Sequence, residues 1–346
     1  MSLKYTAIRA MFEALWLSQL PRLVRQLSES RGVIFTLHRV LPDAPAEFSP
    51  NAILQVRPDF LDYVIERVRA LDIDIVTLDE ALERLAAPEK GRPFVVFTFD
   101  DAYKDNLQYA LPVLRRQQCP FTLYVPTALV DGVGEVWWQA LEDILTRQEA
   151  VAVLEGDETQ YLGTRTQAEK QQVYSDLYWR MRKMPEAERV EMMRAFAASY
   201  GYDLDRQCRD LIMDWQELRL FASEPLCTLG AHTVHHYELA KLPLEQARSE
   251  MVQSADILMA QFGQRPAHIS YPIGGSASAG QREFDLAREL GFRSGVTTRP
   301  GGLYARHAQT PHALPRVSLN GLFQARRYVD VFATGALFTW LGKVGA

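Results

Sequence analysis

The sequence predicts a parallel α/β protein that carries one helical insertion. Short apolar runs alternate with segments of helical periodicity along most of the chain, which is the pattern of a parallel sheet covered by helices. One of these runs, Phe94–Phe99, is uniformly apolar and ends in two carboxylates, as expected for a buried strand. A long stretch in the middle of the chain breaks the alternation. The 346 residues suffice for one large barrel or two ordinary domains.

Eight apolar runs are predicted to be strands. In chain order they are Val33–His38, Ile73–Thr77, Phe94–Phe99, Phe121–Pro126, Cys227–Ala231, His268–Tyr271, Ser294–Thr297 and Leu314–Leu319. The intervening helices are expected at Phe60–Leu71, Asp79–Ala86, Asn106–Gln117, Leu244–Phe262 and Gln281–Leu290. Glycines that follow the last two helices, Gly263 and Gly291, are typical helix stops.

The insertion extends from about residue 135 to 222, where no strand pattern is seen. This stretch is rich in Glu, Arg, Gln, Leu and Met, and it contains Trp137, Trp138, Trp179 and Trp215. We therefore expect a set of helices that packs on the barrel as a cap or lobe. The resulting organisation is an N-terminal helical segment (1–32), a main unit (33–320) interrupted by the insertion, and an apolar C-terminal helix (321–346).

The terminal segments bear on where the protein resides. Arginines interrupt the apolar residues of Lys4–Leu27, and the segment lacks a small-residue cleavage site, so no secretory signal is predicted. Its apolar residues recur at helical spacing, which favours a helix packed on the domain, with a membrane-surface helix as the alternative. Val331–Leu341 is too short to span a bilayer. We expect a cytoplasmic protein, with peripheral contact to the inner membrane face left open.

The amino-acid composition argues against nucleic acid as a binding partner and against a disulfide framework. The formal net charge of −5 gives no basic footprint for nucleic-acid binding. The three cysteines (Cys119, Cys208 and Cys227) are odd in number and lack C-x-x-C spacing, so we expect reduced and mostly buried thiols.

Two short segments carry candidate metal ligands. Phe97–Asp101 ends in two adjacent carboxylates, and His232–His236 has the sequence HTVHH directly after an apolar run. Three of the seven histidines of the chain fall within that second segment. A buried strand delivers acid groups to its C-terminal edge, and histidines four residues apart can face one way on a helical turn. This spacing suits a tetrahedral metal.

The pattern offers more candidate side chains than a metal site of this kind needs. His232 and His236 are the favoured ligands, and His235 is the competitor. One carboxylate and two imidazoles leave coordination positions open, which suits a catalytic metal, and the other carboxylate is then free to act as a base. The alternative for Asp101 is that it caps the helix that follows. The combination predicts a metal-dependent hydrolase.

The motifs resemble those of the NodB-homology polysaccharide deacetylases of carbohydrate esterase family 4. The resemblance rests on TFDD and HTVHH together with SYPIGG at 270–275, and it covers roughly residues 33 to 320 apart from the insertion. Flanking segments match as well: MDWQELR at 213–219, LGAHT at 229–233 and GFRSGVTT at 291–298. The resemblance implies a distorted (β/α) barrel that hydrolyses N- or O-acetyl groups from sugars at a divalent metal. The mix of nitrogen and oxygen ligands favours zinc.

Roles carried over from the family are specific. The resemblance implies that Asp100 is the general base and that Asp101, His232 and His236 bind the metal. Ile273 would supply a backbone N–H to the oxyanion if Pro272-Ile273-Gly274 corresponds to the Pro-Tyr-Gly of the family. The alternative is a plain glycine turn after a strand.

The chain departs from the family pattern in two places. Ser270 stands where members often carry an arginine that holds the base, and Arg316 is a substitute only if it is not a surface residue. The late Leu-x-His motif, which supplies the general acid, is missing from 317–320. His38, at the end of the first strand, is the favoured replacement, because the last strand of a closed barrel lies beside the first. His307 and His312 are the other candidates.

The expected substrate is an N-acetylhexosamine unit of an oligosaccharide, a polysaccharide or a lipid-linked precursor. Two alternatives remain: a deformylase or small-molecule amidase on the same scaffold, and a catalytically weak carbohydrate-binding relative. The expected partner is a carbohydrate, and the sequence does not indicate an oligomeric state.

Overall fold

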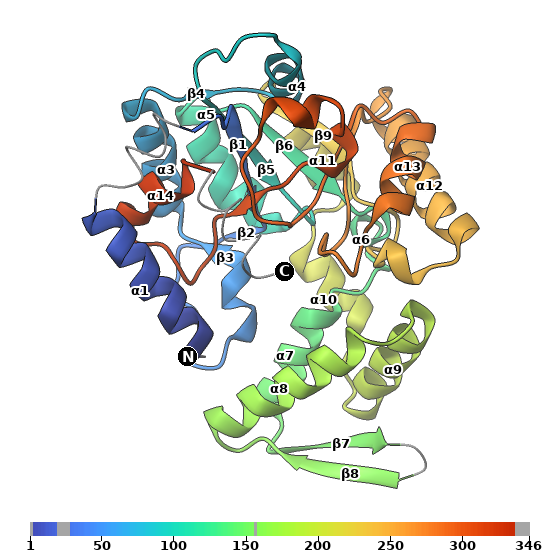
Figure 1. Ribbon diagram of the computed structural model, residues 1–346. Coiled ribbons are helices and arrows are strands. Elements are labelled where there is room, and N and C mark those ends of the chain that lie inside the picture. Colours follow the sequence, from blue (N-terminus) through green and yellow to red (C-terminus); the bar gives the residue numbers. More distant parts are fainter. Residues whose placement is uncertain (1–2, 19–27, 156–157, 336–346) are drawn as a thin grey trace.

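The computed structural model describes residues 3–18, 28–155 and 158–335. A curved parallel sheet lies at the centre, helices surround it, and the insertion projects from one end of this barrel (Figure 1). The fold is the distorted (β/α) barrel with a helical insertion that the sequence analysis predicts.

All strands of the central sheet run parallel. Seven of them follow one another in the order β11-β10-β9-β6-β5-β1-β12, and β4 pairs with the beginning of β5. A parallel bridge between Val296 and Leu314 links the far edge to the segment that leads into β12. The strands are β1 (Gly32–Leu37), β4 (Asp74–Ile75), β5 (Phe94–Phe99), β6 (Phe121–Val125), β9 (Cys227–Ala231), β10 (His268–Ser270), β11 (Ser294–Val296) and β12 (Val317–Ser318).

Each predicted strand is present, and the central ones are uniformly buried because the sheet is covered on both faces. Every residue of β1, β5 and β6 is buried, which explains why these strands are continuous apolar runs instead of alternating patterns. The outer strands are shorter than predicted. In Leu314–Leu319, for example, only two residues form a ladder.

The helices between the strands also agree with the sequence pattern, with one difference. The region predicted as a single helix at Asn106–Gln117 begins with a π-helical turn, η2 (Asn106–Ala110), in which Leu111 N–H donates to the carbonyl of Asn106. Pro112 lacks the N–H that a regular ladder needs at this point. The remaining helices of the main unit are α3 (Pro58–Ala70), α4 (Leu78–Ala86), α5 (Leu111–Arg116), α6 (Thr127–Val130), α12 (Leu244–Phe262) and α13 (Gln281–Glu289).

The insertion contains strands, so the expectation of a purely helical segment was wrong. An antiparallel hairpin is formed by β7 (Ala150–Glu155) and β8 (Glu158–Gly163). Val151 and Val153 are buried in the core and Leu162 packs partly against it, whereas the other side chains of β8 are exposed, so the alternating pattern was too short to detect. The helices of the insertion are α7 (Trp137–Arg147), α8 (Gln167–Met181), α9 (Glu186–Ser199), α10 (Leu204–Leu211) and α11 (Trp215–Ala222).

The ends of the insertion share the barrel core. The ring of Phe221 in α11 packs edge-on against Phe121 of β6 at 5.4 Å between centroids. The N–H of Met213 donates to the carbonyl of Ala102 at 3.0 Å, directly after the Asp-Asp pair. The insertion is therefore not a separable lobe: α8, α9 and the hairpin extend away from the sheet (Figure 1), while its last helix fills the core.

The N-terminal helix α1 (Leu3–Leu17) packs on the domain. Its Phe12 is buried against the rings of Phe323, Tyr328 and Phe332, the last of which belongs to α14 (Val329–Phe332). The rest of Lys4–Leu27 and most of Val331–Leu341 lie outside the described residues. Among the helices that the structure describes, none has the length and apolar content needed to cross a membrane. The three cysteines are free thiols, and burial raises the pKa of Cys208 to about 12.

Candidate metal centre and active site

Three buried side chains converge where β5 and β9 end. The Oδ1 atom of Asp101 lies 3.4 Å from Nε2 of His232 and 3.2 Å from Nε2 of His236. The three ligand atoms lie within 4.8 Å of one another. Within the part of the chain that the structure describes, this is the one group of His, Cys, Asp or Glu residues with the spacing of a metal site.

The donor set fits a divalent metal. Asp101 Oδ1 is buried and makes no hydrogen bond with any described residue, so a strong acceptor is left for another ligand. Nδ1 of His232 donates to the carbonyl of Ser270 at 2.7 Å, which turns Nε2 toward Asp101. Metal-binding histidines usually have this second hydrogen bond, since it fixes the ring and its tautomer.

Turns with unusual backbone angles bring the ligands together. Asp101 has a φ of 75° and Ala102 a φ of 58°, so the chain reverses immediately after β5 and both carboxylates reach the same end of the sheet. Asp101 is not a helix cap: the residue before η2 is Asp105.

The histidine segment is a bend, and the expected helical turn between His232 and His236 was wrong. Thr233 and His236 have φ values of 64° and 60°, and Thr233 Oγ1 accepts the N–H of His236 at 3.1 Å. Glu250 of α12 accepts the N–H groups of Val234 and His235, both at 2.9 Å. These side-chain acceptors replace the carbonyls of a helical turn.

His235 does not join the candidate ligand group. Its Nδ1 lies 2.6 Å from Oε1 of Glu250, and nearly half of the side chain is exposed. The hydrogen bond to Glu250 raises the pKa of His235. The choice between His235 and His236 is thus decided by an acid 15 residues away that holds His235 outside the triad.

Asp100 faces the same cavity and is held by Arg316. The guanidinium donates to both carboxylate oxygens, at 2.8 and 2.7 Å, and also to Thr98 Oγ1 and to the carbonyl of Thr297. Arg316 is 1% exposed. The interpretation of Arg316 as the substitute for the arginine of the family is therefore correct, and the surface alternative is wrong.

Ser270 completes this arrangement. Its hydroxyl accepts from Arg316 at 3.0 Å and lies 3.3 Å from Oδ2 of Asp100. The small side chain leaves room for Arg316 to approach Asp100 from the neighbouring segment. Burial raises the pKa of Asp100, but the charge and hydrogen bonds of Arg316 outweigh burial and hold the pKa below its ordinary value.

The loop after β10 has a strained backbone. Ile273 and Gly274 have φ values of 61° and 65°, which is rare for a β-branched residue such as isoleucine. A Cβ at Gly274 would lie 2.7 Å from the N atom of Thr298, so only glycine fits there. Thr298 holds the loop by donating from Oγ1 to the carbonyl of Ile273 and from its N–H to the carbonyl of Gly274.

His38 lies at the same cavity, and the other two candidate acids do not. His38 is partly exposed at the end of β1. Burial lowers its pKa, although Asp101 and Asp100 oppose the change. His307 accepts the N–H of Tyr304, and His312 pairs with the carbonyl of Phe292, both away from the cavity. The structure brings neither His307 nor His312 to the site.

The cavity has a volume of about 530 Å³ and extends from the triad to an aromatic wall. Ile273 and Thr298 line the end near the triad. The insertion supplies the wall. Trp137 and Trp138 come from α7, and Tyr174, Tyr178 and Trp179 come from α8. Sequence reasoning missed this wall, because aromatic residues at helical spacing are as typical of a core. Trp179, which is 55% exposed, shows the difference.

Comparison with known protein families shows to which family the chain belongs. A family model described as polysaccharide deacetylase matches residues 87–295, well over half of the chain and including both metal-ligand segments. The chain belongs to the polysaccharide deacetylase family. The YxkH protein of Bacillus subtilis (strain 168), itself named for this family, is 35% identical over 86 residues. That match covers 23% of this chain and 30% of its relative, so the chain spans less than a third of that relative's length.

Solved structures agree on the fold. The Streptococcus pyogenes deacetylase PplD, determined in complex with acetate, matches with a TM-score of 0.55 and 18% identity over 84% of this chain and 92% of its own. IcaB from Ammonifex degensii matches with a TM-score of 0.54 and 17% identity over 87% of this chain and 97% of its own. At such low identities, the likeness to these two structures concerns only the fold of this family member.

We expect the purified protein to bind about one divalent metal ion per chain. Replacing both His232 and His236 by alanine removes the two nitrogen donors, so metal content measured by elemental analysis should fall to the background of the buffer. The single variant His235→Ala is the matched control and should keep its metal. Undiminished metal in the double variant would contradict the site.

Replacing Arg316 by glutamine should move the acidic limb of the pH dependence of kcat/KM to higher pH. The base works when Asp100 is ionised, and without Arg316 the effect of burial on its pKa is unopposed, so the limb should rise by about one pH unit or more. Arg316→Lys keeps the charge and should show a smaller rise. A limb that stays in place in the glutamine variant would show that Asp100 is not the titrating base.

Proposed function

We propose that this protein is a metal-dependent hydrolase that removes N-acetyl groups from N-acetylhexosamine units. The observation that carries the proposal is a division of labour between two adjacent carboxylates at one end of a cavity. Asp100 is held ionised by the charge of Arg316, which donates to both of its oxygens. Asp101 keeps a free oxygen beside two imidazole nitrogens. One carboxylate is thus prepared to act as a base and the other to bind a metal.

The donor set of two imidazole nitrogens and one carboxylate oxygen suits zinc best. Asp101, His232 and His236 would hold the metal, which would supply polarisation of an acyl oxygen and a lowered pKa for a water molecule. Asp100 then takes the proton of the attacking water, for which its ionised state is required. The backbone N–H of Ile273, in the strained loop beside the triad, donates to the developing oxyanion.

His38 protonates the leaving amine in this proposal. It lines the cavity at the end of β1, next to the strand that carries Asp100. Because burial lowers its pKa, the resting imidazole is neutral at neutral pH. A neutral His38 must therefore take up a proton during the reaction before it protonates the leaving amine.

The aromatic wall supports a sugar as the substrate. The rings of Tyr174 and Tyr178 are stacked at 5.8 Å between centroids, and Trp137 stacks on Tyr178 at 5.2 Å. Trp179 is 55% exposed, and large exposed aromatic rings at a cavity are features of binding sites. The exposed ring of Trp179 matches the apolar face of a sugar ring, in a free oligosaccharide, a polysaccharide or a lipid-linked precursor.

The alternatives are less well supported. A deformylase or small-molecule amidase does not need a cavity of about 530 Å³ whose aromatic wall extends along α8 to Trp179. A carbohydrate-binding relative without activity does not need Asp100 ionised beside a set of metal ligands. Both remain outcomes of the experiment below.

We also propose that the protein is cytoplasmic and that it contacts the inner membrane face peripherally. The support is limited to the apolar character of the termini and to α1, whose Trp16 and Leu17 are exposed at its end. Salt-dependent recovery from membrane fractions would test the contact, and fractionation between cytoplasm and periplasm would test the location.

The function is tested by acetate release from N-acetylated sugars. We expect metal-loaded protein to release acetate from N-acetylhexosamine oligomers, and chelation to abolish the release. Asp100→Asn should retain its metal but lose turnover by several orders of magnitude, because it loses the base and no ligand. Release of formate from N-formyl substrates, or hydrolysis of small amides alone, would favour the alternative on the same scaffold.

His38→Ala should affect substrates according to their leaving group. Turnover of an N-acetylated sugar should fall by about 10²–10⁴-fold, because an amine leaves only when protonated. An activated aryl acetate needs no such proton and should lose much less. Metal content must match the wild type. Equal losses on both substrates would assign His38 a structural role instead, and no loss on either would remove it from the reaction.

A further inference from the structure

His236 is the metal ligand that the barrel holds least directly. Asp101 and His232 come immediately after β5 and β9, so the sheet itself sets their position. His236 lies four residues further on, at a φ of 60°, in a bend that contains a second left-handed residue, Thr233. Such conformations are unfavourable for non-glycine residues and persist only when surrounding contacts impose them.

The barrel supports one half of this bend. Glu250 of α12 binds the N–H groups of Val234 and His235 and the ring of His235. The N–H groups of Thr127 and Ala128, at the start of α6, donate to the carbonyls of Thr233 and Val234. These contacts end at His235. Beyond His236 the barrel contributes Ser278, whose hydroxyl donates to Glu238 and whose carbonyl accepts the N–H of Ala240.

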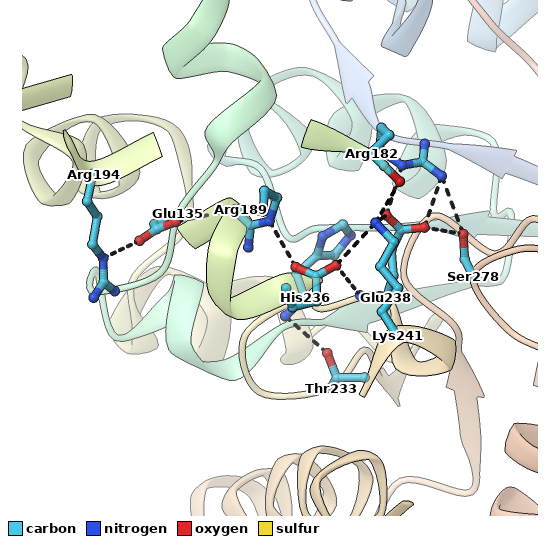
Figure 2. A network of polar contacts seen from close by, with 10 residues as sticks. Glu135, Arg182, Arg189, Arg194, Thr233, His236, Glu238, Lys241 and Ser278 are labelled. Carbon is cyan, nitrogen blue, oxygen red and sulfur yellow. Dashed lines mark hydrogen bonds and ion pairs between the residues drawn. The ribbon is translucent and has the colours of Figure 1, made fainter. Parts of the chain in front are cut away.

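The insertion supports the other half. Arg182, at the end of α8, donates from Nε and Nη2 to the two carboxylate oxygens of Glu238, at 2.9 and 3.0 Å. Glu186 at the start of α9 accepts the backbone N–H of Glu238 at 3.1 Å. Figure 2 shows these contacts together with the bend that contains Thr233 and His236. Glu238 follows His236 by two residues, so its side chain and its backbone are both attached to the insertion.

The junction is buried and joins both parts of the molecule. Lys241 Nζ donates to Glu238 at 2.6 Å and to the carbonyl of Arg182 at 2.7 Å, and Ser278 Oγ donates to Glu238 at 2.6 Å. The side chains of Arg182 and Glu238 are 13% and 4% exposed. Removing Arg182 leaves Glu238 with Lys241 and Ser278 as partners, so the loss concerns the two-point attachment of Glu238 to the insertion.

The insertion also packs against the ring of His236. The centroid of Trp138 in α7 lies 5.0 Å from that of the imidazole, and Nε1 of Trp138 donates to the hydroxyl of Tyr103 at 3.1 Å. His236 therefore lies between an aromatic ring from α7 and a backbone segment attached to α8 and α9.

We propose that Arg182 is a positioning residue for the metal centre: through Glu238 it holds His236 in the ligand geometry, so that the insertion completes the site. This inference rests on the metal centre of the proposed function and extends it to residues outside the family motifs. Arg182 does not touch the ligands and reaches His236 through the bend. It also contacts the aromatic wall, since Nη1 donates to the hydroxyl of Tyr178 at 3.2 Å and the guanidinium lies over the rings of Tyr178 and Trp179.

The test measures zinc affinity by competition with a chelator, on full-length protein. Arg182→Gln should weaken zinc binding about tenfold or more, the range for residues that orient metal ligands. Cobalt(II) bound in place of zinc should show altered absorption bands, because the position of His236 changes. Arg194→Gln is the matched control. It breaks the ion pair of Arg194 with Glu135 at the exposed end of the same network (Figure 2) and should leave affinity and spectrum unchanged.

The readouts separate positioning from stability. A merely structural role would lower the melting temperature of the metal-free Arg182→Gln protein and leave its zinc affinity equal to that of wild type, and this result would overturn the inference. If Arg182→Gln does not fold, Arg182→Lys takes its place. Lysine keeps the charge but not the two-point contact, so zinc affinity should fall at least threefold; unchanged affinity and cobalt spectrum would again overturn the inference.

Failure of the two proposals can be told apart. A wild-type protein that binds no zinc or cobalt would overturn the metal centre, and with it the inference. Tight binding by wild type that the Arg182 variants share would overturn the inference alone.

Discussion

The active site depends on the pairing of one buried arginine with one buried aspartate. A guanidinium taken out of water costs several kcal/mol unless its donors are satisfied, and the partners of Arg316 come from several different strands. Thr98 belongs to β5 and Asp100 directly follows it. Ser270 belongs to β10, and Thr297 directly follows β11. Satisfying this one side chain therefore requires the parallel strands to be in register at the end where the site forms.

The same pairing separates the roles of two adjacent carboxylates. Arg316 occupies both oxygens of Asp100, whereas the turn at Asp101 directs the next carboxylate away from the guanidinium and toward His232 and His236. Asp100 stays ionised because the positive charge of Arg316 compensates its negative charge. Asp101 keeps a free oxygen because no described side chain occupies it in the same way. Environment, and not residue type, distinguishes the candidate base from the candidate ligand.

The features that sequence predicted are those encoded locally. Continuous apolar runs such as Phe94–Phe99 specify buried strands, and the cluster His232–His236 specifies ligands, since each signal lies within a few residues. The features that the sequence left open or missed depend on distant partners. Arg316 meets Asp100 across 216 positions, Glu250 holds His235 outside the candidate ligand group, and the hairpin at Val151 and Val153 shows two buried residues only. The arrangement of the insertion follows from packing that no local pattern records.

Helix α8 has two roles that its sequence does not separate. Tyr174 and Tyr178, four residues apart, lie on one face and line the cavity. Arg182, four residues further, continues the same row and pairs with Glu238 beside the metal-ligand bend. A change that rotates or shifts this helix moves the aromatic wall and the support of His236 together. If the insertion positions the metal ligand as proposed, substrate choice and metal geometry are coupled through α8, and neither can be altered by exchanging the insertion without affecting the other.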